Sequence, residues 1–146
     1  TIITQDALLA TFDKILRALT YSVGGIAGIS LAVAGILIMN VRLVAVSQRV
    51  AEIGLLKALG APEHQVRRLF LVEAVMLASA GAALGVLIGL VGILALRQAF
   101  PVFPIVAPLW APAAAVAVAI ATGLLFGVLP ARRAARLDPV QALTGR

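Results

Sequence analysis

The stretch ALTYSVGGIAGISLAVAGILIMNV, residues 18–41, decides the fold class. Its 24 residues carry no charge and lie between Arg17 and Arg42. A helix of this length rises about 36 Å at about 1.5 Å per residue, which is enough to cross a hydrocarbon core of about 30 Å. The sequence therefore predicts a membrane-spanning helix. We assign the transmembrane element to residues 21–46.

Two further spans are expected. The run Ala74–Leu96 is uncharged over 23 residues, which predicts a span within residues 69–98. No charge occurs between Gln98 and Ala131, but prolines at positions 101, 104, 108 and 112 prevent a regular helix in the first part of that run. The third span is therefore expected at residues 110–129, with Trp110 as an interfacial anchor and Pro130 ending the helix.

The composition supports lipid as the solvent. The chain is 62% hydrophobic and 12% charged, against about 45–50% and about 25% in soluble domains. A soluble enzyme is excluded, and the absence of cysteine excludes disulfide scaffolds and thiolate sites. One histidine and six carboxylates give no metal cluster or catalytic triad, so no catalytic, cofactor-binding or metal residue is assigned. We predict an all-α integral membrane bundle; a large buried helical core is the alternative and would need extensive partner protein.

The basic residues predict the orientation. Nine lie in the middle loop and the tail: Arg42, Arg49, Lys57, Arg67, Arg68, Arg132, Arg133, Arg136 and Arg146. Three lie on the other side: Lys14, Arg17 and Arg97. Positively charged loops stay in the cytoplasm, so residues 47–68 and 130–146 are expected inside and the loop 99–109 outside. An exported start without a signal segment leads us to expect another span upstream, in a longer protein.

Residues 1–20 carry apolar side chains at helical spacing, at positions 8, 12, 15 and 19. We expect an amphipathic, stalk-type helix that continues into the first span. The alternative is an interfacial helix that lies along the outer leaflet.

The segment 47–68 predicts a short amphipathic helix, a stop and a restart. Val46, Val50, Ile53 and Leu56 form one apolar stripe. Gly60 suits a left-handed C-cap, and Pro62 suits the first position of the next helix. The apolar stripe needs a surface, which is expected to be either the inner leaflet or a partner protein.

Small residues recur at fourfold spacing within the spans and predict close helix packing, between these helices or across a dimer. They are Gly24, Gly28, Gly81, Gly85, Gly89, Gly123 and Gly127. In the tail, Arg132, Arg133 and Arg136 are expected to attract anionic lipid headgroups. Asp138 and Pro139 are expected to cap and begin a final helix.

These segments resemble a known family. Residues 49–61, RVAEIGLLKALGA, with FLVEA at 70–74, resemble the signature of FtsX-like permease domains in MacB-type ABC transporters. The stretch LPARRAARLDPVQAL at 129–143 is similar to the C-terminus of the same group. The resemblance implies a four-span permease with an extracytoplasmic domain between its first two spans, of which this chain holds the last three spans.

The resemblance also implies a coupling helix that docks on a nucleotide-binding partner and transmits its ATP-driven motion for export or extracytoplasmic mechanical work. Its residues would be Arg49, Glu52, Ile53, Gly54, Lys57, Ala58 and Gly60. The implied partners are an ATPase subunit or domain carrying ATP and Mg, a second permease copy in a homo- or heterodimer, an extracytoplasmic adaptor and the lipid bilayer, but no nucleic acid. The implied location is the bacterial cytoplasmic (inner) membrane.

The chain is not expected to be an enzyme itself, because no G-x-x-x-x-G-K-[ST] phosphate-binding motif occurs in it. A different class of function is a non-transporting membrane scaffold whose loop helix recruits a cytoplasmic partner. A small secondary transporter is less favoured, since no span carries an ionisable group in its middle.

Overall fold

The computed structural model describes residues 2–144 and shows an all-α chain in that range. The helices are α1 (Ile2–Gln48), α2 (Val50–Ala58), α3 (Glu63–Ala99), α4 (Trp110–Ala135) and α5 (Pro139–Thr144). The helix expected near the start of the chain is the first part of α1, although residue 1 lies outside the described range. The predicted all-α fold class is confirmed.

Three helices are long and apolar enough to cross a membrane: Thr4–Gln48, Glu63–Ala99 and Trp110–Ala135. Most of their large apolar side chains are exposed in the isolated chain. Exposed apolar surface on this scale is favourable only against lipid or other apolar helices. Length, composition and exposure therefore agree with the three predicted spans.

The chain divides into two compact units, one ending at Ala34 and the other beginning at Gly35. The first unit is helix α1 up to Ala34. The hydroxyl groups of Thr11, Thr20 and Ser22 donate to carbonyls four residues earlier in the helix; that of Thr20 lies 2.9 Å from the Leu16 carbonyl oxygen. Such bonds satisfy polar side chains that would otherwise face lipid.

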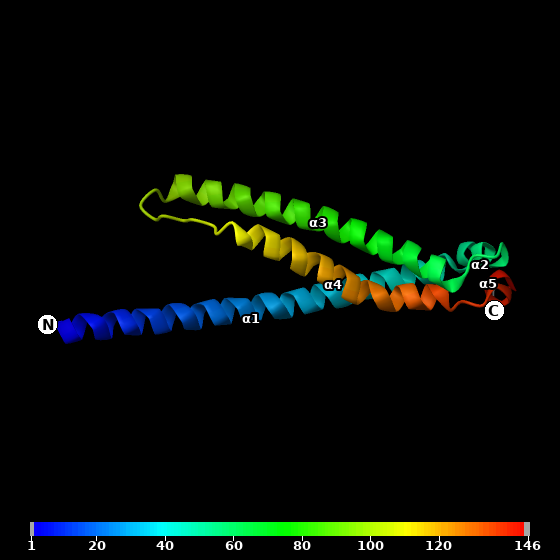
Figure 1. The fold of residues 1–146 in the computed structure, drawn as a ribbon, viewed down its shortest axis with the longest axis horizontal. Coiled ribbons are helices and arrows are strands. Elements are labelled where there is room, and N and C mark those ends of the chain that lie inside the picture. Colours follow the sequence, from blue (N-terminus) through cyan, green and yellow to red (C-terminus); the bar gives the residue numbers. More distant parts are fainter. Residues whose placement is uncertain (1, 145–146) are drawn as a thin grey trace. The chain divides into compact units, whose positions relative to one another are not determined.

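In the second unit, α3 and α4 pack against each other and are joined by residues 100–109 (Figure 1). Glycines in α4 permit this approach. A Cβ added at Gly123 would lie 2.6 Å from the Ala78 Cβ, and one added at Gly127 would lie 3.0 Å from the Ala74 Cβ. Small residues on both helices let the two backbones come close enough for dispersion contacts.

Helix α4 continues through Pro130 and ends at Ala135, so the helix end expected at Leu129 was wrong. Pro130 is the largest fully buried side chain of the described residues. A proline removes one backbone donor, but packing against neighbouring helices keeps such a helix intact. The basic tail therefore begins as the last turns of α4.

The small apolar core of the second unit lies at the end where α2 and α5 are found (Figure 1). It contains Val46, Ile53, Val66 and Ala134, which come from the end of α1, from α2, from the start of α3 and from the end of α4. The Arg42 guanidinium also donates to the Phe70 carbonyl at 3.5 Å. The segments expected on the cytoplasmic side are thus gathered around one core.

Candidate functional site

Helix α2 is a separate element set off by a break at each end. Arg49, before it, has φ −102° and ψ 17°, outside the helical range. After it, Gly60 has φ +98°, which a residue with a Cβ adopts only at a cost. The Gly60 amide donates to the Lys57 carbonyl at 3.0 Å, and the Ala61 amide donates to the Leu56 carbonyl at 3.1 Å. This pair of bonds is a Schellman motif, so the left-handed stop predicted at Gly60 is confirmed.

The restart after Gly60 is shifted by one residue from the expected position. Pro62 has φ −72° and ψ 155°, so it is the N-cap of α3 and Glu63 is the first helical residue. The extended ψ keeps Pro62 outside the helix, while its carbonyl accepts from the amides of Gln65 and Val66. The negative side chain of Glu63 suits this first turn because the helix dipole is positive there.

The inner face of α2 is covered by this chain itself. Ile53 is 3% exposed within the apolar core, and Gly54 is buried. The apolar stripe that was expected to need a leaflet or a partner is therefore partly buried against α1, α3 and α4. The sequence showed that the stripe needed a surface but not that helices distant in the chain would supply it.

Lys57 joins α2 to the end of α4. Its Nζ donates to the carbonyl oxygen of Ala135 at 2.5 Å and to that of Leu137 at 2.6 Å. The last carbonyls of a helix have no partner within the helix, and the C-terminal end of a helix attracts cations. The Lys57 ammonium group thus satisfies the end of α4, a role that its position in the sequence did not reveal.

The outer face of α2 and its C-cap present Glu52, Leu55 and, at the cap, Leu59 to the surroundings. Leu55 is 54% exposed and Leu59 is 78% exposed, and Glu52 is also exposed. Positions 52, 55 and 59 follow the spacing of one helix face. Neither leucine was among the expected coupling residues, although this spacing could have identified them.

The structure divides the seven expected coupling residues into two groups. Ile53, Gly54 and Lys57 lie on the inner side of α2 and hold it in place. The exposed ones are Arg49, Glu52, Ala58 and Gly60. Their part in docking stays a prediction, and the inner three are not free to face a partner.

The tail arginines belong to the end of α4. Arg132 and Arg133 lie in its last turn and Arg136 is its C-cap; all three are exposed. Arg146 lies outside the described residues. Asp138 accepts a hydrogen bond from the Val140 amide at 3.0 Å, which confirms the expected cap before α5. Helix α5 then packs on α2.

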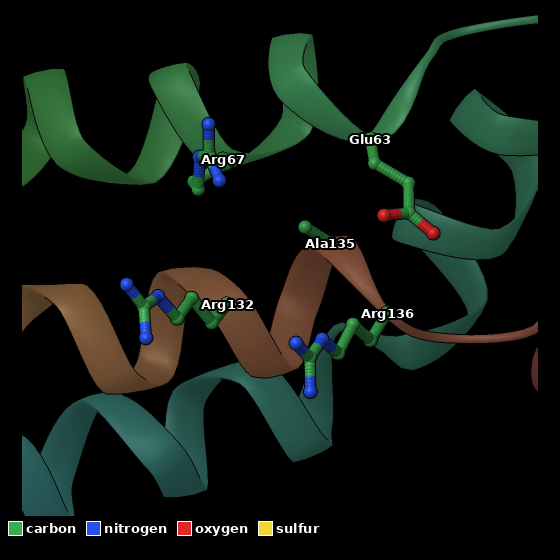
Figure 2. Close-up of a pocket in the computed structure, with 5 residues that line it drawn as sticks. All are labelled: Glu63, Arg67, Arg132, Ala135 and Arg136. Atoms are coloured by element: carbon green, nitrogen blue, oxygen red, sulfur yellow. The ribbon is translucent and has the colours of Figure 1, made fainter.

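A hollow lies between the start of α3 and the end of α4 (Figure 2). It encloses about 310 Å³ and is lined by Glu63, Arg67, Arg132, Ala135 and Arg136. Three of its five lining side chains are guanidinium groups. Arg67 and Arg132 are 65 positions apart in the sequence, so their proximity could not be predicted without the packing of α3 on α4.

Of the seven glycines expected to pack, two do so within this chain, namely Gly123 and Gly127. In the part of the chain that the structure describes, a Cβ at each of the other five would have no neighbour within 4 Å: Gly24, Gly28, Gly81, Gly85 and Gly89. A packing role for those five stays a prediction. Gly35, which was not among the seven, packs against the ring of Phe126.

Three helices that are long and apolar enough to span a membrane, with a short helix packed in the core of the second unit, define a helical protein of the multi-pass membrane class. Residues 24–139 match the FtsX-like permease C-terminal family. The chain belongs to that family, as its sequence motifs predicted.

Curated relatives extend the likeness. The chain is 39% identical over 142 residues to the uncharacterized ABC transporter permease YknZ of Bacillus subtilis (strain 168), covering 97% of this chain and 36% of the relative. It is 42% identical to the macrolide export ATP-binding/permease protein MacB of Shewanella oneidensis, over 97% of this chain and 22% of that protein. It is also 42% identical to the probable syringafactin export ATP-binding/permease protein SyfD of Pseudomonas syringae pv. tomato, over 94% of this chain and 21% of that protein. The chain thus spans about a third or less of each relative's length.

Proposed function

We propose that this chain is part of the membrane (permease) subunit of an ATP-binding cassette transporter, and that α2 receives the motion of a nucleotide-binding partner. Family membership and the names of the relatives support the transporter class. ATP and Mg would be held by the partner, because the chain has no phosphate-binding loop motif of its own.

The placement of α2 carries this proposal. Its inner face is fixed by Ile53 to a core that includes α1, α3 and α4, and by Lys57 to the carbonyls that end α4. Its outer face is free, with apolar and acidic side chains exposed. A force on the outer face would therefore move the ends of all three longer helices together, since close-packed interiors transmit displacement rather than absorb it.

The work performed would be export or mechanical work outside the membrane. The names of MacB and SyfD describe macrolide export and syringafactin export by those proteins. For this chain we propose transmission of ATP-driven motion along the spans to the extracytoplasmic side. The substrate would be recognised by parts other than the loop 100–109, whose exposed side chains are largely apolar.

A second permease copy is part of the proposal. A Cβ added at Gly81, Gly85 or Gly89 in α3 would meet no atom of another element within 4 Å among the described residues. Glycines at fourfold spacing on a spanning helix permit close packing of another helix. We propose that a helix of the second copy, or of an upstream span, packs there.

The experiment that tests the proposal replaces the outer face of α2. In the assembled transporter, Leu55→Glu with Leu59→Glu should weaken association with the nucleotide-binding partner about tenfold or more, as loss of two central apolar contacts does at other interfaces. Transport-stimulated ATP hydrolysis should fall with it, while membrane insertion stays intact. Co-purification of the partner and ATPase assays measure both effects.

The matched control is Val140→Glu with Leu143→Glu, two exposed apolar residues on α5. It adds the same charge at the same end of the unit and should leave both readouts close to the wild-type values. Equal coupling in the α2 variant and the wild type would refute the docking role. A partner that depends on α2 but hydrolyses no ATP would favour the membrane-scaffold alternative instead.

A further inference from the structure

The hollow between α3 and α4 gathers positive charge that the chain does not neutralise. Arg67 projects from α3, and Arg132 and Arg136 come from the end of α4, with Glu63 as the single carboxylate (Figure 2). Within residues 2–144 the structure records no hydrogen bond or ion pair for these three guanidinium groups. Three positive charges against one negative charge leave an excess of two.

Like charges gathered in this way repel one another unless an anion lies between them. Guanidinium groups suit a phosphate best, because each can donate two parallel N–H bonds to its oxygens. A volume of about 310 Å³ is at the small end of the range for ligand pockets, which begins at about 300 Å³. The hollow therefore has the charge and the size for one phosphate-bearing group.

The position of the hollow along the spans indicates where that phosphate comes from. Arg132 is the first charged residue after the uncharged run that ends at Ala131. The apolar part of α4, residues 110–131, is about 33 Å long at about 1.5 Å per residue, close to the thickness of a hydrocarbon core. The arginines that follow it thus lie at the level of the lipid phosphates, on the side that the basic residues predict to be cytoplasmic.

We propose that this hollow binds the headgroup of an anionic phospholipid, with Arg67, Arg132 and Arg136 on the phosphodiester. Glu63 lies within reach of the same space and accepts a hydrogen bond from a headgroup hydroxyl, as phosphatidylglycerol provides. Binding of a lipid at this site does not depend on which substrate is transported.

A lipid bound here would lie directly beside the attachment of α2. Ala135 lines the hollow, and its carbonyl oxygen is also the acceptor for Lys57. The headgroup would hold the start of α3 and the end of α4 together at the point where α2 is tied to them. The composition of the membrane could in this way set how firmly α2 is seated.

The test compares two variants that remove the same charge. Arg67→Gln with Arg132→Gln removes two arginines that line the hollow, whereas Arg68→Gln with Arg133→Gln removes their exposed neighbours, which do not line it. The full chain, purified in a neutral detergent, is titrated with dioctanoyl phosphatidylglycerol, dioctanoyl phosphatidylcholine or inorganic phosphate, and bound lipid is counted by native mass spectrometry.

We expect the wild type to bind phosphatidylglycerol at least about tenfold more tightly than phosphatidylcholine. The hollow variant should lose about tenfold or more of that affinity, since each arginine near a phosphate contributes a several-fold factor. The neighbour variant should stay within about twofold of the wild type. Equal losses in the two variants would overturn the proposal, because they would show attraction by general surface charge.

Two other outcomes would also overturn it. Inorganic phosphate that displaces the lipid at equal concentration would show a site for a free anion. Unchanged lipid binding in the hollow variant, together with loss of a co-purifying cytoplasmic protein, would show a protein contact.

If the hollow variant does not fold, Glu63→Gln provides the test. This substitution keeps a hydrogen-bonding group but removes the negative charge. Phosphatidylglycerol should therefore bind several-fold more tightly to Glu63→Gln than to the wild type. Weaker or unchanged binding there would count against the site.

Discussion

Lys57 is the side chain that connects the short helix to the rest of the molecule. Its ammonium group donates to the carbonyl oxygen of Ala135, the last residue of α4, at 2.5 Å and to that of Leu137, just after the helix, at 2.6 Å. These carbonyls lie in partly buried surroundings, where an unsatisfied acceptor is costly. In the sequence Lys57 resembles an ordinary surface charge, but in the structure it links two elements that are nearly 80 positions apart.

Replacing Lys57 by methionine keeps the length of the side chain and removes the donor. We expect a loss of about 1–3 kcal/mol of stability at this end of the second unit, because two carbonyls lose their partner. Hydrogen exchange of amides in residues 132–143 should become faster, and the thermal midpoint of the detergent-purified protein should fall. Lys14→Met, at an exposed position in the first unit, is the control. Equal amide exchange rates in residues 132–143 of the Lys57→Met and Lys14→Met variants would contradict the proposed stabilising role of Lys57.

At the scale of elements, the seam between α3 and α4 shows how small residues position the site. Gly123 and Gly127 face Ala78 and Ala74, and the backbones approach too closely for a larger side chain at Gly123. This seam fixes the distance between the start of α3 and the end of α4. The core residues Val66 and Ala134 and the arginines of the hollow depend on that distance.

A reciprocal exchange tests the seam. Gly123→Ala alone would place its Cβ 2.6 Å from that of Ala78 and should lower the thermal midpoint, because overpacking costs about 1–3 kcal/mol. Combining it with Ala78→Gly removes the opposing methyl group, so the double variant should recover most of the loss. Two single effects that simply add would show that these positions do not touch.

Particular elements show how far the sequence predicts this fold. The three spans follow from uncharged runs, the stop at Gly60 from its freedom to adopt positive φ, and the cap at Asp138 from its side-chain acceptor. Local chemistry decides each of these. The end of α4, by contrast, is not decided by Pro130: its side chain is fully buried, and the helix continues to Ala135 despite the missing backbone donor.

The candidate site was only partly predictable, because it also depends on packing between different helices. The sequence located α2 and the residues that form it, but assigning its inner and outer faces requires the positions of α1, α3 and α4. Ile53 and Lys57 therefore face inward although docking was expected of them, and the exposure of Leu55 and Leu59 was not predicted. Likewise, fourfold spacing of glycines indicates packing without stating which helix is packed, as Gly123 and Gly85 illustrate.

At the scale of the whole molecule, both proposed functions depend on the direction in which the spans cross the membrane. The count of basic residues predicts that α2, α5 and the hollow lie in the cytoplasm and that the loop 100–109 lies outside. Docking of a nucleotide-binding partner and binding of inner-leaflet lipid both require that direction. A reversed chain could do neither.

The most direct measurement is the accessibility of single cysteines to a membrane-impermeant maleimide in intact cells. The chain has no cysteine of its own, so Leu59→Cys on α2 and Val102→Cys in the loop, both highly exposed, each provide one thiol in it. We predict that Val102→Cys reacts in intact cells, whereas Leu59→Cys reacts only after permeabilisation and is protected by the nucleotide-binding partner. Reaction of Leu59→Cys in intact cells as fast as that of Val102→Cys would contradict the cytoplasmic location of α2.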